Sequence, residues 1–151
     1  MNIVDTNFIY LNQQFDSREA LLKKVAEDLQ DAGRIQDVER FYQDILSREE
    51  EVSTYMGDGI AIPHCKTDNI NTSTVILVRN AKPIPWNDED EPADMIFILS
   101  VKDTKQGDDQ SHLKVLSRLA QNIMDEDFMD EMKHEQNKTK IYETLKVVEG
   151  R

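Results

Sequence analysis

Residues 95–99 read Met-Ile-Phe-Ile-Leu, the longest uninterrupted apolar run in the chain. A similar run, Thr74-Val75-Ile76-Leu77-Val78, precedes it. Both runs are short, rich in β-branched residues and apolar along almost their whole length, which is the pattern of strands covered on both faces. We therefore expect two central strands of a sheet that has helices on either side.

Two helices are predicted on the N-terminal side of these strands. Apolar residues recur at helical spacing through 21–29. A helix-start box at 16–19 precedes them, with Glu19 placed to reach back to the backbone at the start of the helix, and Gly33 follows them where a left-handed C-terminal cap is expected. A second stripe of apolar residues at helical spacing follows Asp37, and it predicts a second helix that ends near the charged stretch 47–51.

The other expected elements complete an α/β chain. Helices interleaved with strands predict one domain over residues 1–151, a sandwich with a mixed parallel and antiparallel central sheet flanked by helices on both faces. The remaining elements that we expect are a strand at 8–11, a proline-bearing edge strand at 83–86 with an acidic turn at 87–91, and helices at 113–123, 126–132 and 139–147.

Composition excludes several classes of function. The chain has 30 acidic and 18 basic residues and a formal charge of −12, which would repel a nucleic acid backbone and attract a basic protein, although the acidity can also serve solubility alone. No apolar run approaches the roughly 20 residues that span a bilayer. The start, MNIVDTNF, has no secretion signal, and one cysteine makes no intrachain disulfide, so we expect a cytoplasmic protein.

Residues 57–66 read GDGIAIPHCK and raise the question of what His64 does. If the strand at 60–62 persists through Pro63, the two-residue period places Ile60, Ile62 and His64 on one face and Cys65 on the other. This separation argues against a Cys65–His64 nucleophilic dyad and against a shared metal site, and we expect no metal. Glycines beside a strand end favour a binding site and an ordinary turn equally.

Other candidate residues lie elsewhere in the chain. His112 falls at the start of the third helix, where the dipole disfavours a protonated ring and free N–H groups attract an anion, although a core histidine bonded to a carbonyl is an alternative. Arg48, Ser53 and Thr54 are suited to contact a phosphate, although surface pairing with Glu49 or Glu51 is an equal alternative for Arg48. The nucleotide-binding glycine loops are absent from the sequence, which argues against a nucleotide as the phosphate source and leaves a phosphorylated protein donor open. We assign no role to His134.

Together these residues resemble the type-2 EIIA proteins or domains of the bacterial phosphoenolpyruvate-dependent sugar phosphotransferase system, the fructose/mannitol group. The resemblance covers nearly the whole chain, and Cys65 departs from the small residue that usually follows the histidine. The matching motifs are Arg48-Glu49, Ser53-Thr54, Gly57, the core Gly59-Ile60-Ala61-Ile62-Pro63-His64, the segment Lys82-Pro83-Ile84-Pro85-Trp86, and His112-Leu113.

The resemblance implies a phosphotransferase component that needs no cofactor. His64 would accept a phosphoryl group from phospho-HPr as a tele-phosphohistidine and pass it to a cysteine of a cognate EIIB for sugar uptake. His112 would orient the phosphoryl group, Arg48 would add positive charge, and Ser53 and Thr54 would contact the phosphate or the partner. Association with the membrane component EIIC would occur only through EIIB.

Two alternatives remain open from the sequence. A regulatory, nitrogen-type EIIA would keep His64 as the phosphoacceptor and control partner proteins through its phosphorylation state. An acidic binding module with structural histidines would gain no acid-labile phosphate. The sugar is not indicated, because an EIIA need not contact it.

Overall fold

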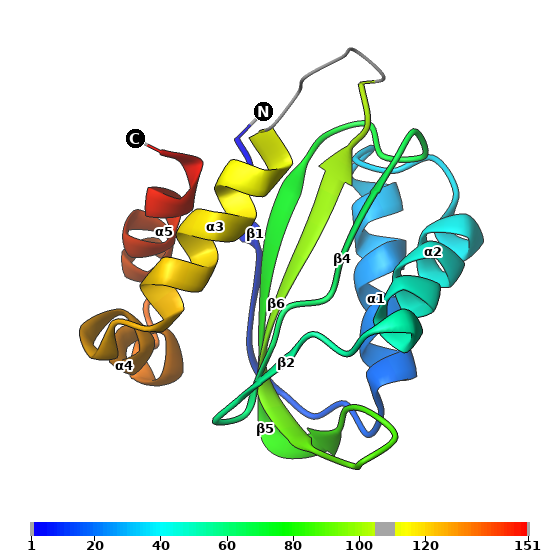
Figure 1. Cartoon of the computed structure of the whole chain (residues 1–151). Helices are drawn as coiled ribbons and strands as arrows, with labels where there is room; N and C mark the ends of the chain where they lie inside the picture. The colour runs from blue at the N-terminus through cyan, green and yellow to red at the C-terminus, as the bar shows by residue number, and fades with distance from the viewer. Residues whose placement is uncertain (1, 105–110, 151) are drawn as a thin grey trace.

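A six-stranded mixed sheet forms the centre of the structure, a computed structural model that describes residues 2–104 and 111–150 and leaves the side chains of residues 111 and 112 undescribed (Figure 1). The strand order is β1-β5-β6-β3-β2, and β4 also pairs with β6. Strands β1 and β5 are parallel, β5 and β6 are antiparallel, and β3 and β4 both run parallel to β6. The strands are β1 (Val4–Gln13), β2 (Tyr55–Gly57), β3 (Ile60–Ala61), β4 (His64–Thr67), β5 (Thr74–Pro85) and β6 (Pro92–Lys102).

Helices cover both faces of this sheet, as predicted. Figure 1 shows α1 and α2 on one side and α3, α4 and α5 on the other. The helices are α1 (Arg18–Asp31), α2 (Val38–Glu51), α3 (Ser111–Ile123), α4 (Glu126–His134) and α5 (Lys138–Leu145), followed by the 3₁₀ helix η1 (Lys146–Glu149). Each layer of helices buries its own hydrophobic cluster against the sheet. The expected α/β sandwich with a mixed sheet is confirmed.

The two apolar runs form the middle of the sheet because both of their faces are covered. Residues 74–80 of β5 and 95–101 of β6 are all buried, and alternate side chains enter the two clusters. Leu77 and Phe97, for example, face the α3 side, whereas Ile76 and Ile98 face the α1 side. The prediction of two central strands is confirmed.

The ends of α1 follow from its sequence, with one correction. The Ser17 hydroxyl accepts a hydrogen bond from the third helical N–H at 3.0 Å. At the other end Gly33 has φ +76°, and the N–H of Arg34 donates to the Leu29 carbonyl at 2.8 Å, which is the expected glycine cap. The expected reach-back by Glu19 is wrong, because Ser17 is the cap residue and the Glu19 carboxylate pairs with a neighbouring arginine on the surface.

Several element boundaries also differ from expectation. The strand predicted at 8–11 is the middle of the longer β1. The strand expected at 60–62 and onward through Pro63 is divided into β3 and β4, which Ile62 and Pro63 separate. Pro83 and Pro85 belong to the end of β5, which is not a separate edge strand. The pairing with β1 ends near Asn80, so this part of β5 pairs with β6 alone. The two prolines, which have no N–H to donate, are therefore tolerated on the side of β5 that has no neighbouring strand.

Candidate functional site

His64 opens β4, beside Leu99 of β6. Its ring atom Nδ1 lies 2.8 Å from the carbonyl oxygen of Ile62. A carbonyl oxygen only accepts, so Nδ1 carries the hydrogen, and in a neutral ring the lone pair is then on Nε2. Within the described part of the chain Nε2 has no hydrogen-bond partner, and the side chain is partly exposed. The geometry therefore presents Nε2 as a nucleophile.

A tight hairpin between β2 and β3 leads into this histidine. Gly57, Asp58 and Gly59 all have positive φ, at +91°, +53° and +81°. The Gly59 carbonyl accepts hydrogen bonds from the N–H groups of Asp94 and Met95, both at 2.9 Å. A Cβ on Gly59 would lie 2.4 Å from an Asp94 carboxylate oxygen. Glycine is therefore suited to position 59 both by its conformation and by the close approach of β6.

Cys65 points away from the face that carries His64. Ile60 and Ile62 belong to the cluster on the α3 side, whereas Ala61 and Cys65 belong to the cluster on the α1 side, which confirms the expected alternation. The Cys65 side chain is 8% exposed, and burial raises the pKa of its thiol to about 12, with a smaller contribution from the negative charge of Asp44 on α2.

A thiol with so high a pKa stays protonated at neutral pH and is a poor nucleophile there. Instead it packs as a small apolar side chain under α2. Among the described residues, no group of three or more His, Cys, Asp or Glu side chains is arranged to hold a metal ion.

The other predicted phosphate contacts lie where α2 ends. The guanidinium of Arg48 donates from Nη1 to the Val52 carbonyl at 3.2 Å, and its side chain is partly exposed. The Ser53 hydroxyl oxygen accepts from the N–H of Tyr55 and from the side-chain amide of Asn87. Both residues precede the hairpin, and neither is hydrogen bonded to His64.

Thr54 is held by a carboxylate that the sequence analysis did not single out. Its hydroxyl donates to Glu49 Oε1 and its N–H to Glu49 Oε2, each at 2.5 Å. Glu49 is 2% exposed and lies one turn after the buried Ile45 and two turns after Phe41. A carboxylate on the apolar stripe of a helix is the sequence signal that would have marked it.

The two remaining histidines differ in position. His112 is the second residue of α3, as expected, but its side chain lies outside the described residues, so its relation to His64 stays a prediction. His134 is at the end of α4 with an exposed ring whose Nδ1 lies 3.0 Å from the Asp130 carbonyl oxygen.

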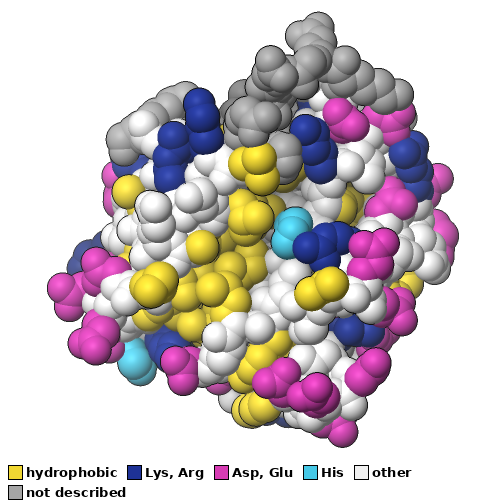
Figure 2. All heavy atoms as spheres, in the orientation of Figure 1, with side chains coloured by type: hydrophobic (Ala, Val, Ile, Leu, Met, Phe, Trp, Pro, Cys, Tyr) yellow, Lys and Arg dark blue, Asp and Glu magenta, His cyan; other side chains and the backbone are white. Residues whose placement is uncertain are grey.

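An apolar surface lies on the side of the sheet covered by α3. Figure 2 shows hydrophobic side chains gathered in a broad strip across this face, with a histidine and basic side chains along its edge. Within this face lies a hollow of about 590 Å³ in which Met56, Ile60, Met129 and the 83% exposed Met124 share the lining with charged side chains such as Asp58 and Glu126. Such a patch, next to the strand that leads to His64, is typical of a protein-binding surface.

No described helix combines the length and apolar character that crossing a membrane requires.

Comparison with known proteins identifies relatives over nearly the whole chain. The family model "Phosphoenolpyruvate-dependent sugar phosphotransferase system, EIIA 2" matches residues 2–147. The chain is 32% identical over 144 residues to a fructose-specific EIIA component from Haloferax volcanii, covering 95% of this chain and 92% of that protein. It is 34% identical over 126 residues to multiphosphoryl transfer protein 2 of Escherichia coli, covering 83% of this chain but only 15% of that longer protein.

Solved structures show the same fold at lower identity. The nitrogen regulatory protein IIA-Ntr from Neisseria meningitidis superposes with a TM-score of 0.82 at 23% identity, covering 95% of this chain and 96% of that one. The mannitol IIA of E. coli, solved in complex with phosphorylated IIB, gives a TM-score of 0.76 at 20% identity, with 97% of each chain covered. The resemblance seen in the sequence is confirmed, and the chain belongs to the type-2 EIIA family of the phosphoenolpyruvate-dependent sugar phosphotransferase system.

Proposed function

We propose that this chain carries a phosphoryl group on Nε2 of His64, between phospho-HPr and a cysteine of a cognate EIIB. The observation that carries the proposal is the 2.8 Å contact between Nδ1 of His64 and the Ile62 carbonyl oxygen. This bond holds the hydrogen on Nδ1 and leaves the Nε2 lone pair at a partly exposed position. Family membership supports the same role.

Each transfer exchanges one bond to phosphorus for another. The Nε2 lone pair attacks the phosphorus of the donor phosphohistidine, the N–P bond of the donor breaks, and its electron pair returns to the donor ring. In the second step a thiolate of EIIB attacks the same phosphorus, and the Nε2–P electron pair returns to His64. Throughout, Nδ1–H stays bonded to the Ile62 carbonyl, so His64 needs no base to remove a proton. Positioning and charge neutralisation then account for most of the catalysis.

We assign the charge and positioning roles to residues that precede or follow His64 in the chain. His112 would orient the phosphoryl oxygens, and Arg48, on the last turn of α2, would supply positive charge. Ser53 and Thr54 remain candidates for phosphate or partner contacts. Because the Thr54 hydroxyl already donates to Glu49, we propose that its contribution comes chiefly through holding the backbone.

The apolar surface beside the hairpin supports an exchange of protein partners. Its exposed methionines are side chains that adapt to more than one partner, which suits a carrier that meets a donor and an acceptor in turn. A net charge of −12 favours a basic donor. We propose that residues 1–151 act as one such domain in the cytoplasm, reach EIIC only through EIIB, and serve a fructose-type permease, as the name of the Haloferax relative indicates.

Reconstitution tests the proposal. Incubation with phosphoenolpyruvate, enzyme I and HPr should give one acid-labile phosphate per chain, and NMR of the phosphorylated ring should place it on Nε2. His64→Gln should remain folded and take no phosphate, whereas Cys65→Ala should retain most of the transfer because Cys65 faces the opposite core. Full labelling of His64→Gln would refute the assignment. His112→Ala should slow transfer more than it lowers the free energy of unfolding.

The identity of the protein that accepts the phosphoryl group distinguishes the regulatory role from the sugar-uptake role. The likeness to IIA-Ntr is one of fold alone at 23% identity, whereas two relatives above 30% identity are named a multiphosphoryl transfer protein and a fructose-specific EIIA component. Rapid transfer from the phosphorylated chain to an EIIB cysteine supports sugar uptake. A chain that is phosphorylated but fails to pass the group to any EIIB would support regulation.

A further inference from the structure

A continuous series of hydrogen bonds joins Glu49 to the His64 ring. The two carboxylate oxygens of Glu49 accept from Oγ1 and N of Thr54, each at 2.5 Å. The Thr54 carbonyl accepts from the N–H of Ile62 at 3.2 Å. The Ile62 carbonyl in turn accepts from Nδ1 of His64 at 2.8 Å. Two residues, Thr54 and Ile62, thus connect Glu49 on the last turn of α2 to the proposed phosphoacceptor.

Burial makes the position of Glu49 unusual. The side chain is 2% exposed and forms no ion pair with any lysine or arginine among the described residues. A buried carboxyl group costs several kcal/mol unless hydrogen bonds replace its hydration, so its partners matter to the local structure. Both carboxylate oxygens of Glu49 accept hydrogen bonds from a single residue, Thr54, just after the end of α2.

The link from Thr54 to Ile62 extends the β2–β3 hairpin by one residue. The ladder pairs Tyr55 with Ala61, and the bond from Ile62 N–H to the Thr54 carbonyl is the next step toward His64. At its turn the hairpin is already held by the bonds from β6 to the Gly59 carbonyl. Glu49 therefore anchors the end of the hairpin that carries the histidine.

We propose that Glu49 is a positioning residue for phosphoryl transfer, which fixes the Ile62 carbonyl through Thr54 and so holds His64 in the Nδ1–H form. The inference rests on the proposed role of His64. Without the carboxylate, one Thr54 donor loses its acceptor, and the 3.2 Å bond to Ile62, the longest in the series, is the first to open. The His64 ring then loses the fixed carbonyl that selects its tautomer.

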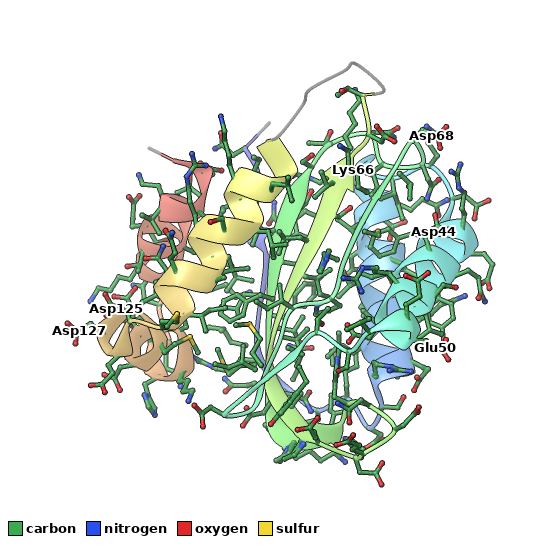
Figure 3. The ribbon with its side chains drawn as sticks, in the orientation of Figure 1. Asp44, Glu50, Lys66, Asp68, Asp125 and Asp127 are labelled. Carbon is green, nitrogen blue, oxygen red and sulfur yellow. The ribbon has the colours of Figure 1, made fainter. Side chains whose placement is uncertain are left out.

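The variant Glu49→Gln tests this with little change of shape. Its amide keeps one acceptor oxygen and places an NH₂ group against the other Thr54 donor. The matched control is Glu50→Gln, which removes the same charge from the adjacent, exposed residue on α2 (Figure 3). A displacement approaching 1 Å in a reacting group lowers rates by about 10²-fold, so we expect Glu49→Gln to reduce kcat for phosphorylation by roughly 10- to 100-fold. KM for phospho-HPr should change less than about threefold.

The second measurement needs no donor. ¹⁵N NMR of the unphosphorylated protein should show His64 as the Nδ1–H tautomer in the wild type and in Glu50→Gln, and as a mixture of tautomers in Glu49→Gln. If Glu49→Gln does not fold, Thr54→Val removes only the hydroxyl donor and should produce the same changes at smaller size. An unchanged kcat and an unchanged tautomer in the folded variant would overturn the proposal. Failure of the wild type to accept phosphate would refute the proposed function, and the tautomer comparison would still decide the role of Glu49.

Discussion

The Cys65 thiol should be nearly unreactive in the native protein, although it is adjacent in sequence to the proposed phosphoacceptor. A free cysteine with a pKa of about 8.5 is roughly one quarter thiolate at pH 8. With the pKa of Cys65 raised to about 12 by burial, the thiolate fraction falls to about 10⁻⁴, a difference of roughly two thousandfold. Labelling with Ellman's reagent at pH 8 measures this directly, because the chain has one cysteine.

The same shift makes the free energy of unfolding depend on pH. The native state keeps its thiol proton up to about pH 12, whereas the unfolded chain loses it near pH 8.5, so stability is present below pH 8.5 and is lost as the pH rises. Linkage gives a loss of about 1.2 kcal/mol between pH 8 and pH 9.5. The pKa of Tyr10 is also raised, by burial and by Asp28, but an ordinary tyrosine ionises near pH 10, so its contribution belongs to higher pH.

Urea unfolding of the wild type and of Cys65→Ala at pH 8 and pH 9.5 isolates the contribution of the Cys65 thiol to the free energy of unfolding. The variant loses some packing at every pH but should lack the 1.2 kcal/mol decline, while the labelling rate of the wild type in urea should match that of a free thiol. Native labelling within tenfold of a free thiol, or equal pH slopes for the two proteins, would refute the argument that burial controls this cysteine.

Two further matched pairs test the packing around the sheet. Arg34→Met should lower the free energy of unfolding in urea by about 3–5 kcal/mol, because the Arg34 side chain is 4% exposed and pairs with Asp5. Arg40→Met should lower it by less than about 1 kcal/mol, because the Arg40 side chain is 51% exposed. Equal losses for the two variants would contradict this reasoning. Gly57→Ala should lower the free energy of unfolding by about 1–2 kcal/mol, because alanine is strained at a positive φ. Gly59→Ala should lower it further, because its Cβ would also clash with Asp94. Equal decreases in melting temperature would show that the Asp94 side chain moves aside without a penalty.

Local pattern was sufficient for most of the elements. The apolar spacing of 21–29, the helix-start box at 16–19 and Gly33 located α1, because end signals and periodicity act within a few residues. Continuous apolar runs at 74–78 and 95–99 identified the central strands, since a strand covered on both faces has no polar side. The alternation from Ile60 to Cys65 was also predictable, because side chains along an extended chain alternate in direction.

The errors arose where partners distant in sequence decide the structure. Pro83 and Pro85 continue β5 because β1 has already ended beside that part of the sheet, which no local pattern records. Glu19 was expected to cap α1, but Ser17 occupies the cap position and moves Glu19 one place out of register. Glu49 was named only as part of the Arg48-Glu49 motif, and its burial was not expected because a charged residue at a helix end is ordinarily a solvated one.

The sequence by itself determined the fold class and the family, and it singled out His64 as the candidate phosphoacceptor, since these depend on periodicity and on a motif of contiguous residues. Only the tertiary structure decided which ring nitrogen faces outward, because that depends on the carbonyl of Ile62 and on the carboxylate of Glu49 that anchors the hairpin. Hydrogen bonds between segments are set by the way the chain packs, and packing brings α2, the hairpin and β4 together at the proposed phosphoacceptor.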